Sequence, residues 1–130
     1  MATIYREFRI QAPLEQVWAA LRDFGALHEV LARGFVISCE LAGDTRTITF
    51  SNGMTAREQL VGIDEDAQRV AYTSVGGKSI HHNASAQVQA EGPDVTRFVW
   101  ITDVLPDGLA APIAAMMDEG VSAIKDTLER

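Results

Sequence analysis

The last part of the chain most constrains the fold, because residues 107–130 predict one long amphipathic helix. Apolar residues recur there with the 3.6-residue period of one helical face, at Ile113, Met117, Val121, Ile124 and Leu128. Pro112 is compatible with this helix only in the first turn, where its missing N–H group removes no hydrogen bond. Such a helix is about 33 Å long and must pack its apolar side against a large surface.

Most of the chain before that helix predicts antiparallel strands. Residues 2–10 alternate as a strand, although Arg6 falls on the apolar side. Pro13 then starts a helix, and Gly25 is expected to end it in a left-handed conformation. A second short helix is expected at about residues 26–31. Two short helices cannot cover a sheet, so we expect them to plug one end of it.

Six further strands are expected, and the turns between them predict the register. Residues 43–44 form a two-residue hairpin, since glycine supplies the positive φ that such a turn needs. At residues 51–53, a three-residue loop ending in a left-handed Gly53 keeps the apolar side chains of both strands on one face. A two-residue loop would slip the register and invert that face. The three-residue loop places Arg46 opposite Glu58 on the inner face.

Later strands extend the inner face less uniformly. Tyr72 continues it if it pairs near Leu60. Residues 81–91 alternate most clearly, with polar side chains outward and small apolar ones inward. Residues 95–105 are apolar on both sides, so the orientation of Trp100 is left open.

The bulk properties exclude several classes of function. A chain of 130 residues without repeats or linkers predicts a single domain over residues 1–130. The net charge of −7 disfavours nucleic acid or an anionic membrane as the main partner. No apolar run approaches the roughly 20 residues that span a bilayer, so stable membrane insertion is not expected. The N-terminus lacks the layout of a signal peptide, so a cytoplasmic location is expected.

The sequence predicts neither a metal site nor a cofactor. Cys39 is the only cysteine, and we expect an inert thiol among apolar neighbours. His81 and His82 are adjacent in a strand and point to opposite faces, so they cannot ligate one ion together. There is no glycine-rich phosphate loop.

The order of one strand, two short helices, six strands and a long helix resembles the START-like (SRPBCC) superfamily, in particular its polyketide cyclase/dehydrase-type branch. The markers are Ala12-Pro13, Val17-Trp18, Asp23-Phe24-Gly25, Arg46-Thr47-Ile48, Asn52-Gly53, Glu58-Gln59-Leu60, Arg69, Tyr72, Trp100 and Pro106. The resemblance covers nearly the whole chain. It implies an α+β helix-grip fold, in which a curved seven-stranded antiparallel sheet wraps around the C-terminal helix and leaves a cavity.

The same resemblance implies where a ligand would lie. In the plant abscisic-acid receptors of this superfamily, the positions matching Arg46 and Glu58 line the ligand pocket, and the loops matching residues 51–55 and 77–82 close over its mouth. Ala84 departs from the superfamily, where an aromatic residue is common.

The inner-face pattern allows either a cavity or tight packing. Small residues such as Ala56 and Ala86 either leave space or let the helix approach closely. Arg46 and Glu58 would be costly to bury apart, so a buried pair is expected, which can be structural or can anchor a polar group of a ligand.

We therefore expect a binding or carrier protein for a small, mostly apolar molecule such as a polyketide, a lipid or a sterol. The expected ligand-binding residues are Arg46, Ile48, Phe50, Glu58, Leu60, Tyr72, Ser74, His82, Ala84, Ala86, Met117 and Val121.

The alternatives are an enzyme or an interaction module. A polyketide cyclase or dehydratase would be a lyase or isomerase using the same cavity, with Glu58, Tyr72 and His82 as candidate acids and bases. An interaction or co-chaperone module would instead have a filled interior and a broad apolar surface patch. Ligand identity and oligomeric state, a homodimer included, are left open.

Overall fold

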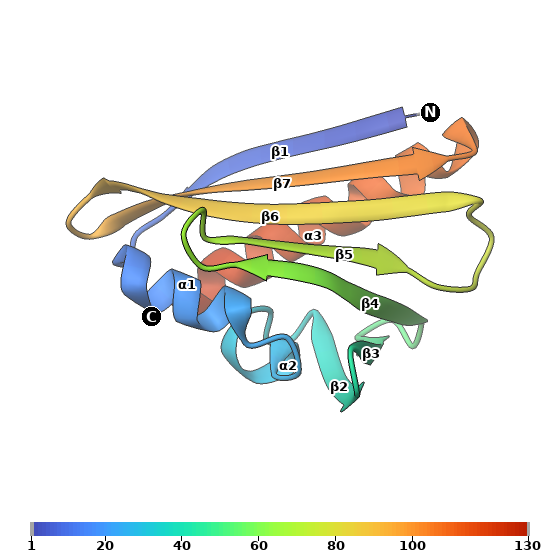
Figure 1. The fold of residues 1–130 in the computed structure, drawn as a ribbon, viewed down its shortest axis with the longest axis horizontal. Coiled ribbons are helices and arrows are strands. Elements are labelled where there is room, and N and C mark those ends of the chain that lie inside the picture. The colour runs from blue at the N-terminus through green and yellow to red at the C-terminus, as the bar shows by residue number, and fades with distance from the viewer. Residues whose placement is uncertain (1, 130) are drawn as a thin grey trace.

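Seven antiparallel strands form one sheet in the order β1-β7-β6-β5-β4-β3-β2. The computed structural model describes residues 2–129. The strands are β1 (Ala2–Ile10), β2 (Val36–Ala42), β3 (Thr45–Phe50), β4 (Thr55–Asp64), β5 (Arg69–Ser74), β6 (His81–Gly92) and β7 (Val95–Leu105). The helices are α1 (Leu14–Arg22), α2 (Leu27–Val30), the 3₁₀ turn η1 (Asp107–Leu109) and α3 (Ala110–Leu128). The chain thus has the expected helix-grip fold, with α3 running along one face of the sheet (Figure 1).

The register predicted from the turns is confirmed. Arg46 pairs with Glu58 across β3 and β4, and Leu60 pairs with Tyr72 across β4 and β5. Gly53 has a φ of 88°, the left-handed conformation that the three-residue loop requires. Because side chains in a strand alternate, this register puts the apolar residues of both strands on the side of α3.

The C-terminal helix differs from the expectation in which residues it buries. Met117, Ile124 and Leu128 are buried as predicted, but Val121 is only half-buried, and Gly120 takes the inward position. An ideal period of 3.6 residues from Ile113 reaches position 120 rather than 121, so Val121 turns to the side of the helix.

Gly25 follows α1 for a different reason than expected. Its φ is not in the left-handed region, so the predicted left-handed stop is wrong. A Cβ atom at this position would lie 3.0 Å from Cδ2 of Leu41 on β2. Gly25 therefore lets the turn between α1 and α2 lie against the edge strand.

The orientation of β7 is settled by its pairing with β6. Phe98 and Val104 are almost fully buried, and Trp100 between them faces the same side as Ala86. Arg6, which falls on the apolar side of β1, extends toward the helix and donates a hydrogen bond from Nε to Oδ1 of Asp118 on α3, at 2.6 Å. Arg6, the one charged residue on the apolar side of the strand pattern, thus links β1 to α3.

Two hydrophobic clusters hold α3 against the sheet. The larger cluster joins α1, α2 and the C-terminal half of α3 to the sheet, and the smaller one gathers Ile4, Val104 and Met117 near the beginning of α3. Within residues 2–129 no helix is long and apolar enough to cross a membrane.

Candidate functional site: a cavity between the sheet and α3

A cavity of about 580 Å³ separates the concave face of the sheet from α3. Strands β3 to β7 form its floor, and Ile113, Met116, Met117 and Gly120 of α3 lie over it. One end of the cavity is closed by Leu21 of α1, Leu27 of α2 and Leu31, which follows α2. The two short helices therefore plug this end of the sheet, as expected. The helix therefore stands off from the sheet, and tight packing of this interior is excluded.

The opposite end of the cavity is bordered by two loops. Met54 comes from the β3–β4 connection, Thr55 begins β4, and residues 75–79 come from the β5–β6 connection. Gly76 and Gly77 both have a φ of 77°, a conformation that favours glycine. These segments overlap the two loops that the resemblance placed at the mouth.

A buried ion pair lies in the floor. Nε and Nη2 of Arg46 donate to the same oxygen of Glu58, Oε1, at 2.9 and 2.7 Å. Only 7% of the Arg46 side chain and 14% of the Glu58 side chain are exposed. Among residues 2–129, no group donates a hydrogen bond to the second oxygen of Glu58, Oε2. This oxygen can accept a hydrogen bond from a guest.

The surroundings of Arg46 hold its guanidinium in place. Nη1 donates to the carbonyl oxygen of Phe24 at 3.2 Å, and the guanidinium carbon lies 3.8 Å from the centre of the Phe24 ring. The ring of Tyr72 lies on another side, 5.1 Å away. A planar guanidinium stacks well on aromatic rings. The two rings therefore stabilise the Arg46 cation in its nearly buried position.

Tyr72 provides a polar group within the apolar wall. Its hydroxyl oxygen accepts a hydrogen bond from Nε1 of Trp100 at 3.1 Å. Burial, and secondarily the negative charge of Glu58, raise the pKa of Tyr72 above its usual value, so the hydroxyl remains protonated. Since Trp100 uses the oxygen as acceptor, the Tyr72 proton can be donated to a guest.

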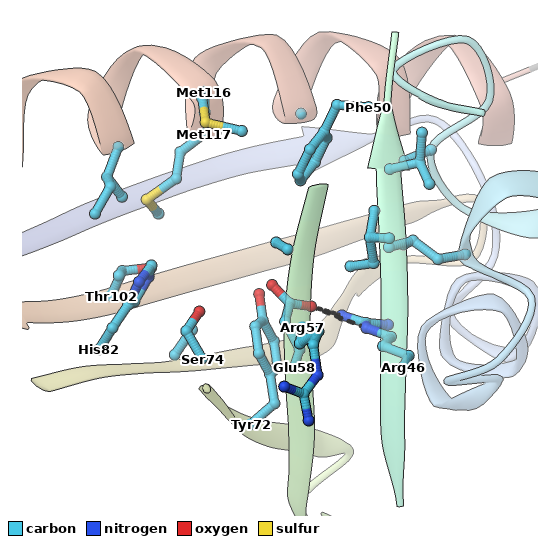
Figure 2. Close-up of a pocket in the computed structure, with 18 of the residues that line it drawn as sticks. Arg46, Phe50, Arg57, Glu58, Tyr72, Ser74, His82, Thr102, Met116 and Met117 are labelled. Carbon is cyan, nitrogen blue, oxygen red and sulfur yellow. Dashed lines mark hydrogen bonds and ion pairs between the residues drawn. The ribbon is translucent and has the colours of Figure 1, made fainter. Parts of the chain in front are cut away.

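Three further polar side chains face the cavity nearer its mouth. Ser74, His82 and Thr102 come from β5, β6 and β7, and they lie on one side of Tyr72 while Arg46 lies on the other (Figure 2). Burial lowers the pKa of His82 below its usual value, which outweighs the opposite effect of Glu58. The imidazole is therefore neutral at neutral pH.

The helix forms an apolar wall that comes close at one point. A Cβ atom on Gly120 would lie 3.0 Å from two ring atoms of Trp100. The absence of a side chain at Gly120 thus lets α3 rest on the indole. Met116 and Met117 lie about one turn earlier, and their flexible thioethers can adapt to guests of different shape (Figure 2).

Most residues predicted to bind a ligand lie around the cavity. Those lining it are Arg46, Ile48, Phe50, Glu58, Tyr72, Ser74, His82, Ala84, Ala86 and Met117. Leu60 does not line it and packs instead against the larger hydrophobic cluster. Val121 does not line it either, because the buried face of α3 runs through Gly120. The prediction of these two residues as cavity walls is corrected on that geometry.

Sequence reasoning did not identify several of the lining residues. Trp100 and Thr102 were missed because both faces of β7 are apolar and the pattern could not orient the strand. Gly120 carried a usable signal, since a glycine inside a helix is unfavourable and often marks a close approach.

Cys39 stays outside the cavity lining. Its thiol lies 3.8 Å from the carbonyl oxygen of Phe24, and burial raises its pKa above the usual value. A thiol that stays protonated is a poor nucleophile, in agreement with the inert role expected from the sequence.

A helix-grip fold with a cavity between the sheet and the C-terminal helix is the architecture of the START-like class of proteins. The chain belongs to the family described as polyketide cyclase / dehydrase and lipid transport, which matches residues 1–130.

Solved structures share this fold at low sequence identity. An uncharacterised protein from Bacillus thuringiensis is 18% identical, with a TM-score of 0.86 over 98% of both chains. A START superfamily protein from Mycobacterium smegmatis is 13% identical, with a TM-score of 0.79 over 98% of this chain and 97% of the other. The di-domain ARO/CYC protein StfQ from the steffimycin biosynthetic pathway is 16% identical, with a TM-score of 0.81 over 98% of this chain and 45% of its own.

Proposed function

We propose that this protein binds a small, mostly apolar molecule in the cavity between the sheet and α3. The observation that carries this proposal is an apolar cavity of about 580 Å³ with a buried Arg46–Glu58 pair in its floor. The apolar walls of such a space lack the packing contacts that a filled core would supply, which lowers the stability of the unliganded fold. A cavity this destabilising is expected to have an occupant.

The polar groups suggest how the guest is oriented. Oε2 of Glu58 accepts, and the hydroxyl of Tyr72 donates, so a hydroxyl group of the guest can bond to both, while a carbonyl group can accept from Tyr72 alone. Phe50, Met116 and Met117 supply apolar contacts on the other side (Figure 2). The family description, which includes lipid transport, agrees with a carrier role.

The test is a thermal-shift and native mass spectrometry screen against aromatic polyketides, sterols and fatty acids. A bound guest should raise the unfolding temperature of the wild type, and Arg46→Ala combined with Glu58→Ala should remove most of that shift. If no ligand stabilises the wild type more than the double variant, the proposal is wrong.

A second candidate function is acid–base catalysis of a polyketide cyclisation or dehydration. It is favoured by the placement of Glu58, Tyr72 and His82 around one cavity and by the fold shared with a di-domain ARO/CYC protein. The neutral imidazole can accept a proton from a carbon next to a carbonyl group, while the hydroxyl of Tyr72 donates to the carbonyl oxygen. The test is turnover of poly-β-ketone analogues, and activity that survives Glu58→Gln, Tyr72→Phe and His82→Gln singly would contradict this candidate.

A further inference from the structure

The polar side chains of the cavity floor lie in one row across neighbouring strands. Arg46 pairs with Glu58, and Glu58 pairs with Ser74. The pairing of β5 with β6 continues in step toward His82, which is the next inward residue beside Ser74. Thr102 on β7 pairs with the residue two positions after His82, so it lies diagonally beside the imidazole on the same face.

The two ends of this row differ in how their hydrogen-bonding groups are satisfied. Arg46 and Glu58 bind each other, and Arg46 also binds the Phe24 carbonyl. In contrast, the side chains of Ser74, His82 and Thr102 make no hydrogen bond to any other group within residues 2–129. Thr102 is only 2% exposed, so bulk water does not readily satisfy its hydroxyl. Ser74 and His82 are half-buried, and all three side chains face one cavity without a side-chain partner in the protein, so they are available to a polar group of a guest.

The three polar side chains at this end favour a neutral partner, because the cations that also line the cavity, Arg57 and Lys78, are exposed to solvent. Ser74 and Thr102 carry no charge, and burial keeps the pKa of His82 low, so the imidazole is neutral. The positive charge of Arg46, at the other end, is already compensated by Glu58. A carboxylate or phosphate placed beside Ser74 would lose water without gaining a buried, unpaired cation, whereas a hydroxyl or carbonyl group would gain hydrogen bonds.

We infer that Ser74, His82 and Thr102 form a second polar subsite, which binds a neutral hydroxyl or carbonyl oxygen of the guest. This inference rests on the proposed function and specifies its ligand. Glu58 on β4 and His82 on β6 are two strands apart, about 10 Å at the usual strand spacing. The guest is therefore a neutral molecule with an oxygen at each end, and an aliphatic chain with one polar head leaves this subsite empty.

The experiment compares rigid ligands that differ only in the second oxygen. The ligands are 2-hydroxyfluorene, 2,7-dihydroxyfluorene and 7-hydroxyfluorene-2-carboxylate, and binding is followed by the fluorescence of Trp100, which lines the cavity. The wild type should bind the dihydroxy compound about three- to tenfold more tightly than the monohydroxy compound, the gain of about one neutral hydrogen bond. The carboxylate should bind more weakly than the dihydroxy compound.

Variants then assign the gain to the subsite. Ser74→Ala combined with Thr102→Val keeps the shape of the wall and should reduce the preference to less than about twofold, because the affinity for the dihydroxy compound falls more than the affinity for the monohydroxy compound. Ser85→Ala, on the other face of β6, should keep the full preference. His82→Gln is a second test that keeps hydrogen-bonding groups, and circular dichroism verifies the fold of each variant.

The outcomes separate the two proposals. Equal affinity of the wild type for the mono- and dihydroxy compounds, or tightest binding of the carboxylate, overturns the second subsite and leaves the ligand-binding function intact. No binding of any fluorene to the wild type contradicts both. A preference that persists in the double variant shows that the second oxygen binds elsewhere.

Discussion

Arg46 and Glu58 pair through a single carboxylate oxygen, because Nε and Nη2 both donate to Oε1 and leave Oε2 without a donor among residues 2–129. An arginine–carboxylate pair often uses both oxygens, so this geometry leaves one acceptor for a guest. The same pair is nearly buried, which makes it important for stability as well as for binding.

Breaking that pair should destabilise the fold. We expect Glu58→Ala to lower the free energy of unfolding by about 3–5 kcal/mol, because it leaves the Arg46 cation buried without a counter-charge. Urea denaturation measures the change. Arg9→Ala, which removes exposed pairs with Glu7 and Glu91 on the outer face, serves as the control and should change stability less. A similarly small effect of Glu58→Ala would show that the pair is solvated.

Gly120 should resist replacement although it lies within a helix. Alanine normally stabilises a helix interior by up to about 1 kcal/mol relative to glycine. Here the added methyl group would lie 3.0 Å from the Trp100 ring, so Gly120→Ala should lower the unfolding temperature. Ser122→Ala, at an exposed position of the same helix, should leave it unchanged or raise it. Stabilisation by both changes would mean that α3 can shift away from the indole without loss.

The burial of His82 predicts a pH dependence of stability. Its pKa in the folded protein lies below the ordinary value of 6.5, so the unfolded chain binds the proton more readily. Stability contributed by the neutral imidazole is present above pH 6.5 and is lost as the pH falls through the lower folded pKa. The wild type should therefore lose more unfolding free energy between pH 7 and pH 5 than His82→Gln does.

Denaturation curves at the two pH values, together with NMR titration of the imidazole, check this dependence. His81→Gln, on the opposite face of the same strand, should behave like the wild type. An imidazole of His82 that titrates at or above 6.5 would contradict the prediction.

Filling the cavity should abolish binding without unfolding the protein. Ala84 is buried in the floor between Tyr72 and Thr102, so the ring of Ala84→Phe would enter the space for a guest. Affinity for 2-hydroxyfluorene should fall by about tenfold or more, and the unliganded variant should unfold at an equal or higher temperature. Asn83→Phe, which points outward from the neighbouring position, should bind normally. Unchanged affinity in Ala84→Phe would place the binding site elsewhere.

The sequence alone was sufficient for the architecture and for much of the cavity floor. Strand alternation and the turn at Gly53 fix which residues face each other, and a one-residue slip would expose the whole apolar face. The pairing of Arg46 with Glu58 and of Leu60 with Tyr72 follows from these local rules.

Residues whose position depends on packing could not be predicted in this way. The face of β7 that carries Trp100 is apolar like the opposite face, and only the register with β6 orients it. The inward position of Gly120 follows from the helical period, but the close contact of α3 with Trp100, which requires a glycine there, does not. Contacts between elements far apart in the chain thus decide the orientation of β7 and the contact of α3 with the sheet.

The space between the sheet and α3 is a property of the tertiary structure. Small residues such as Ala84 and Ala86 are compatible with close packing and with a cavity, and the sequence does not distinguish these cases. The distance between the helix and the sheet depends on contacts at both ends of α3, where two separate hydrophobic clusters hold it. Those contacts join residues far apart in the chain, so no local pattern contains the volume that they enclose.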